Sequence, residues 1–143
     1  MEKDLPSLNI LADTLNKAQH PYYLSMRFQG CSKATIQTVR RAVKPQYWQV
    51  GENIGNAQGL NLQISKNLDK IEEGFVVIDP DIKMRHGWLK ATIEAKNAID
   101  NTGMIGYKWR PNKGKNSTKK GIKINRTGCI FGTKYISAEA FER

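Results

Sequence analysis

The sequence predicts one α+β domain over residues 1–143, with two or three helices, mostly antiparallel strands and a basic hairpin loop near the C-terminus. A chain of 143 residues has the usual length of one domain. Its content of 39% hydrophobic and 25% charged residues is that of an ordinary globular protein. Helical patterns dominate the first third and strand patterns the last third, without an internal repeat or a long linker, which favours the α+β class.

The first third contains the clearest elements. Apolar residues at helical spacing predict a helix over 7–18, with Ser7 as its N-cap. Strict alternation of apolar and polar residues favours a strand over 22–28, with a short helix as the alternative. Residues 32–44 form the best helical pattern, since an apolar stripe lies opposite a basic face.

The middle of the chain is expected to be less regular. Three glycines make residues 46–59 rich in turns. Residues 60–64 alternate like a strand, and a short helix capped by Gly74 is expected over 65–73. Residues 88–99 favour a helix, because Ala, Leu, Glu and Lys are good helix formers, but their alternation leaves a strand as the alternative.

The remaining strands are expected around the C-terminal third. Residues 75–79 are predicted to form a buried strand between Gly74 and a proline. Strands are also predicted over 104–109 and 122–131, joined by a mobile loop of Lys, Asn and Gly over 111–121. This strand-rich part spans residues 101–138.

The charge distribution is the strongest indication of function. The formal net charge is +10. The N-terminal part over 1–50 is helical and basic, and the overlapping window 14–51 contains six basic and no acidic residues. Residues 101–138 contain nine basic and no acidic residues, while the segment 52–100 is net acidic. Two basic blocks predict a surface for a polyanion, so nucleic acid is the expected partner, with duplex DNA as the expected form.

The helix over 32–44 is the first candidate binding element. Its turn and helix, GCSKATIQTV, resemble the recognition helix of helix-turn-helix proteins, which would place it in the major groove of DNA. If residues 22–28 form a strand, the motif is absent and a basic surface helix that grips phosphates remains. In either case the candidate nucleic-acid-binding residues are Lys33, Gln37, Arg40, Arg41 and Lys44.

The C-terminal basic block is the second candidate. Aromatic and basic residues alternate here, which suits stacking on unpaired bases as well as neutralisation of phosphates. A solvated hairpin tip with a buried aromatic pair is the structural alternative. The candidate residues of this block are Lys108, Trp109, Arg110, Lys113, Lys115, Lys119, Lys120, Lys123 and Arg126.

A third candidate is catalytic. Pro80 and Asp81 precede Glu94 and Lys96 in a pattern that resembles the PD-(D/E)xK motif of restriction-like nucleases and junction resolvases. The resemblance implies that Asp81 and Glu94 hold Mg²⁺ and that Lys96 orients water or stabilises charge. This requires residues 88–99 to form a strand, because in a helix Glu94 and Lys96 point about 200° apart.

Other features set the cellular expectations. Two cysteines, Cys31 and Cys129, are too few for a disulfide framework or a zinc site. No signal segment or transmembrane span is evident, so we expect no membrane partner and a cytoplasmic location, in a bacterium or a phage-infected host. No cofactor is expected unless the protein is a Mg²⁺-dependent nuclease. A phage or plasmid factor that binds an acidic host protein remains an alternative, and the oligomeric state stays open.

Overall fold

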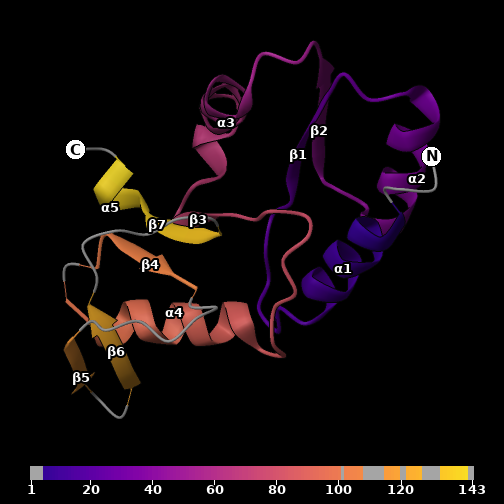
Figure 1. The fold of residues 1–143 in the computed structure, drawn as a ribbon. Coiled ribbons are helices and arrows are strands. Elements are labelled where there is room, and N and C mark those ends of the chain that lie inside the picture. Colours follow the sequence, from indigo (N-terminus) through magenta and orange to yellow (C-terminus); the bar gives the residue numbers. More distant parts are fainter. Residues whose placement is uncertain (1–4, 101, 108–114, 120–121, 127–132, 142–143) are drawn as a thin grey trace.

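The computed structural model describes residues 5–100, 102–107, 115–119, 122–126 and 133–141 (Figure 1). It confirms the α+β class. Among the described residues, more of the chain is helical than expected. The helices are α1 (Leu5–Asn16), α2 (Lys33–Val43), α3 (Asn56–Ser65), the 3₁₀ turn η2 (Leu68–Lys70), α4 (Trp88–Ala98) and the short α5 (Ala138–Phe141).

The strands form three small sheets. β1 pairs with β2, β7 lies between β3 and β4, and β5 pairs with β6. All pairs are antiparallel except β1–β2, which is parallel. The strands are β1 (Ser25–Gln29), β2 (Tyr47–Gly51), β3 (Gly74–Val77), β4 (Met104–Gly106), β5 (Lys115–Lys119), β6 (Ile122–Arg126) and β7 (Lys134–Ser137).

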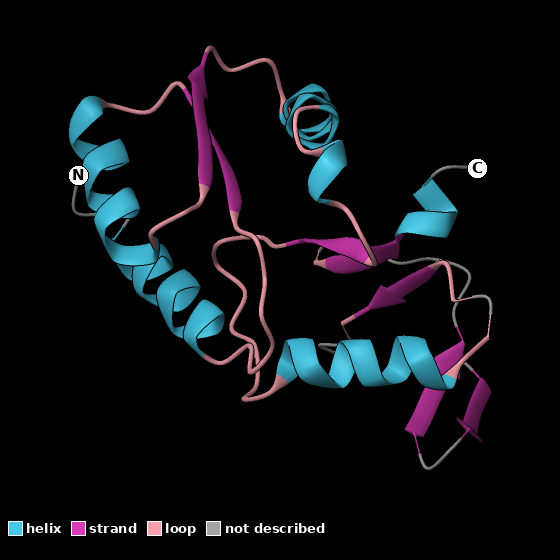
Figure 2. Cartoon of the chain, turned by 180° about the vertical axis from the view of Figure 1, so that it is seen from behind, coloured by secondary structure: helices cyan, strands magenta, loops and turns pink. Residues whose placement is uncertain are grey.

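The segment β1–α2–β2 is a parallel strand pair joined by a crossover helix. Parallel strands require such a connection, and α2 supplies it. The Ser32 side chain caps α2 by accepting a hydrogen bond from the amide of Thr35, and Lys44 ends the helix in the left-handed conformation before Pro45. Ile36 is buried beneath the helix. Figure 1 and Figure 2 show α1 and α2 on one side of this strand pair and α3 on the other.

Several sequence predictions are confirmed within a few residues. The helix over 32–44 with its Ser32 cap, the helix over 88–99 and the strand within 22–28 are all present. The expected N-cap Ser7 is wrong, because α1 already includes Leu5 and Ser7 lies inside the helix.

The segment 60–64 is helical, so its predicted strand is wrong. Leu60 and Ile64 alternate with polar residues, yet they are also one helical turn apart, and α3 uses the second pattern. Its buried Gly59 lies against the side chain of Gln29 in β1. The predicted helix over 65–73 is reduced to the short η2 turn.

The C-terminal third pairs differently from the expectation. β5 occupies part of the segment expected to be a loop over 111–121, and it pairs with β6. β7 was not predicted at all, although it is the central strand between β3 and β4. Its Tyr135 is only 2% exposed and donates a hydrogen bond to the carbonyl of Glu73 at 2.8 Å.

The main apolar cluster lies between α1, α4 and the β3–β7–β4 sheet. Ala18, Met84, Trp88 and Leu89 form its buried centre, and Tyr107 packs edge-on against Trp88 with ring centroids 5.8 Å apart. Burial raises the pKa of Tyr107 to about 12. The phenol therefore stays protonated into the alkaline range, and it shares a 2.8 Å hydrogen bond with Thr92.

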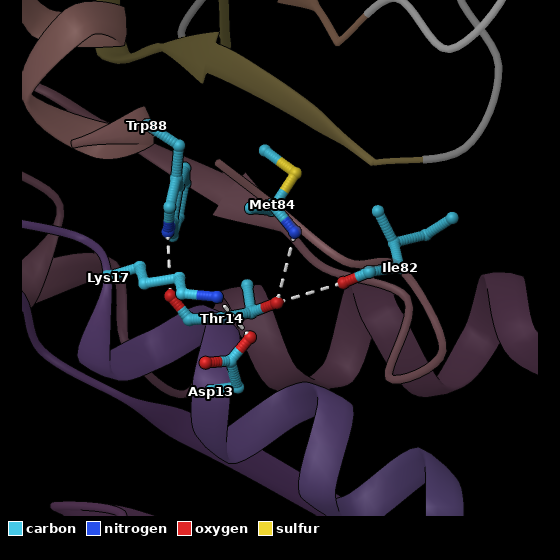
Figure 3. A network of polar contacts seen from close by, with 6 residues as sticks. All are labelled: Asp13, Thr14, Lys17, Ile82, Met84 and Trp88. Carbon is cyan, nitrogen blue, oxygen red and sulfur yellow. Dashed lines mark hydrogen bonds and ion pairs between the residues drawn. The ribbon is translucent and has the colours of Figure 1, made fainter. Parts of the chain in front are cut away.

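A buried threonine fastens α1 to the loop that leads into α4 (Figure 3). The Thr14 hydroxyl donates to the carbonyl of Ile82 at 3.0 Å and accepts from the amide of Met84 at 3.2 Å. The indole Nε1 of Trp88 donates to the Thr14 carbonyl at 2.8 Å. Thr14 is 0% exposed, so water cannot reach its hydroxyl and replace these hydrogen bonds.

Replacing Thr14 by valine should destabilise the protein by about 2 kcal/mol, because the change leaves the buried Met84 amide and the partly buried Ile82 carbonyl without their hydrogen-bond partner. Urea unfolding measures the loss. Thr38→Val is the matched control, since the Thr38 hydroxyl also donates to a backbone carbonyl, that of Ala34, but is exposed. The control should change stability by no more than about 0.5 kcal/mol. Equal losses in the two variants would contradict the role assigned to Thr14.

Candidate nucleic-acid interface

The outer face of α2 gathers the first set of predicted binding residues. We call Lys33, Gln37, Arg40, Arg41 and Lys44 the α2 polar face. The apolar stripe of the helix turns inward, with Ile36 buried and Val39 and Val43 half-buried. All five residues of the α2 polar face are exposed. The expected basic surface helix is therefore confirmed as a structural element.

Four of these residues surround one surface depression. A shallow hollow of about 430 Å³ is lined by Gln37, Arg40, Arg41, Lys44 and Pro45. No acidic residue lines it, and none of the ion pairs found within the described part of the chain involves α2. The cations of this hollow are thus not neutralised by a carboxylate there.

A tryptophan that the sequence analysis did not select completes this surface. The guanidinium carbon of Arg40 lies 3.8 Å from the centre of the Trp48 ring, a cation–π contact between α2 and β2. Phe28 of β1 meets the same indole edge-on, with centroids 6.5 Å apart. Trp48 nevertheless remains 38% exposed, and Val50, which points to the same side of β2, is 52% exposed.

The opposite side of the strand pair is polar. The Arg27 guanidinium donates to the Gln49 side chain at 3.3 Å, and the Gln49 amide donates to the Tyr47 hydroxyl at 2.6 Å. Arg27 has no acidic partner among the described residues. Arg27 is thus the one charged side chain of β1 and β2, and it is half-buried.

The helix-turn-helix resemblance is not supported by the fold. Residues 25–29, which would belong to the first helix of that motif, form β1. A strand paired in parallel with β2 cannot cross the DNA backbone as the first helix of the motif does. The alternation of apolar and polar residues over 22–28 favours this strand, and α2 remains as a basic surface helix.

The C-terminal arm lies far from α2. Lys115, Lys119, Lys123 and Arg126 belong to the β5–β6 hairpin, where Lys115 is paired with Arg126 in the register. Figures 1 and 2 place this hairpin and α2 at opposite ends of the molecule. The described part of the second basic block therefore lies apart from α2. Five further predicted residues lie outside the described part of the chain: Lys108, Trp109, Arg110, Lys113 and Lys120.

The structure does not assemble the predicted nuclease site. Glu94 and Lys96 lie on helix α4, so they point about 200° apart instead of sharing the face of a strand. Glu94 lies 4.0 Å from Lys90, its neighbour one turn away, and Asp81 is exposed in the loop before α4. In the described part of the chain, no group of three His, Cys, Asp or Glu residues could hold a metal ion. The nuclease hypothesis thus lacks the geometry that its motif requires.

Comparison with known proteins adds no family assignment. No protein-family model, no curated protein and no solved structure matches the chain. Within the described residues, no helix is both long and apolar enough to span a membrane.

Proposed function

We propose that this protein binds nucleic acid through the α2 polar face and that its main ligand is duplex DNA. One observation carries the proposal: Gln37, Arg40, Arg41 and Lys44 line a single depression that contains no acidic side chain. Arginine and lysine neutralise phosphates, and an arginine or glutamine can also contact base edges. Exposed cations that have no ion pair among the described residues suit this role, because a phosphate can contact them without breaking an existing ion pair.

The geometry of α2 supports contacts with the phosphate backbone first. Four cations, Lys33, Arg40, Arg41 and Lys44, are exposed along a helix that spans three turns. Charge neutralisation supplies most of the affinity in such complexes and makes binding depend steeply on salt. The basic residues of the β5–β6 hairpin would contact nucleic acid separately, because the hairpin lies at the other end of the molecule.

A salt titration tests this function. Fluorescence anisotropy with a labelled random-sequence duplex, in EDTA, measures the affinity at several salt concentrations. Four neutralised phosphates should give a log–log slope of about −4. Negligible binding at low salt would contradict the proposal and would direct attention to RNA or to an acidic protein surface.

A further inference from the structure

The contact between Arg40 and Trp48 has a feature that phosphate binding does not explain. Phosphates need cations, and Arg41 and Lys44 already supply them without any aromatic support. Arg40 instead lies over an indole ring at 3.8 Å, and this ring stays 38% exposed. Val50 on the same side of β2 is 52% exposed. A partner that presents only phosphates leaves this apolar surface in water.

A flat, uncharged group on the partner would cover the exposed surface of Trp48 and Val50. An unpaired base stacks on aromatic rings and on guanidinium planes, whereas a base inside a duplex offers only its edges. Among the described residues, the Arg40 side chain has no ion pair and no hydrogen bond that would hold it away from a ligand. The ring thus positions a guanidinium beside the basic depression that Arg40 also lines.

We infer that the Arg40–Trp48 pair is a stacking site for an unpaired base of a nucleic acid that the α2 polar face holds by its phosphates. This inference rests on the proposed function and adds its substrate class. The preferred ligand is a duplex with a single-stranded segment: the cations contact phosphates, and one base next to the duplex stacks at Arg40 and Trp48.

Three probes test the inference on the unmodified protein. The first is a blunt duplex, the second is the same duplex with a short thymidine overhang, and the third carries an abasic overhang of equal length. The two overhangs have the same phosphates, so only the bases differ. We expect the thymidine overhang to bind at least about five-fold tighter than the abasic one, the effect of one stacked base.

A pair of lysine substitutions locates the site. Arg40→Lys keeps the charge but removes the planar group that lies on the ring, whereas Arg41→Lys makes the same change at an exposed neighbour with no ring contact. Arg40→Lys should abolish most of the preference for bases over abasic sites. Arg41→Lys, which changes another residue of the α2 polar face, should alter the affinity for both overhangs alike and leave the ratio between them unchanged. The intrinsic fluorescence of the protein should also be quenched more by the thymidine overhang than by the abasic one.

The outcomes separate the two proposals. If all three probes bind with a steep salt dependence but the two overhangs bind equally, the stacking site is wrong and the proposed function stands. If the preference for bases survives Arg40→Lys unchanged, the stacking site lies elsewhere and this assignment is also wrong. If none of the probes binds, the proposed function itself fails.

Discussion

The double substitution Arg40→Glu/Arg41→Glu is expected to weaken binding to duplex DNA by about 100-fold or more at moderate salt. On a blunt duplex, which offers Arg40 no unpaired base, each arginine is expected to supply a charge-assisted hydrogen bond to a phosphate worth about 1.5–3 kcal/mol, and each glutamate adds repulsion. Both residues line the same depression on α2, so both substitutions weaken the same binding site. Because two phosphate contacts are lost, the slope of the salt dependence should also become shallower by about 2.

A second basic pair provides the control for this experiment. Lys83 and Arg85 are exposed in the loop before α4 and have no ion pair among the described residues. Lys83→Glu/Arg85→Glu changes the net charge by the same amount without touching α2. This variant should bind much more tightly than the α2 variant. Equal losses would mean that total charge governs binding, and wild-type affinity in the α2 variant would remove α2 from the interface.

The α2 helix could be predicted from the sequence because all of its determinants are local. Ser32 caps it, the apolar stripe has helical spacing and Pro45 prevents its extension. The five residues of the α2 polar face follow from that spacing alone. Local signals also predict α4, because its residues are strong helix formers. In a helix, Glu94 and Lys96 do not share a face.

The strands that complete the fold depend on partners distant in the sequence. β2 pairs with β1, which lies on the other side of α2 in the sequence. Because β2 falls in the segment 46–59, whose glycines favour turns, the sequence alone does not single out Trp48. A stretch of β-forming residues after Pro45, with Tyr47, Trp48 and Val50, was the available signal. β7 pairs with β3 across 57 to 63 residues of sequence, from Val77 and Lys134 to Gly74 and Ser137, and no local pattern encodes this contact.

Gly74 begins a strand and does not cap a helix, contrary to the prediction. The local sequence predicts Gly74 as the C-terminal cap of a helix over 65–73, because glycine often follows the last turn of a helix. The structure makes it the first residue of β3, with φ +153° and paired with Ser137 of β7. A Cβ added there would collide with the backbone carbonyl of Ile136 and would lie 2.6 Å from the Tyr135 hydroxyl. Tyr135 is almost fully buried and is held by Glu73, so it cannot move aside.

Gly74→Ala is therefore expected to destabilise the protein by about 2–5 kcal/mol, the sum of backbone strain and overpacking. Gly55→Ala separates these two causes. Gly55 also has a positive φ, +84°, but nothing lies within 4 Å of its added Cβ, so this variant carries only the strain, about 1–3 kcal/mol. Urea unfolding of both variants compares them directly. A smaller loss at Gly74 than at Gly55 would show that β3 does not approach β7 as closely as the register requires, and the position of the central strand would then be wrong.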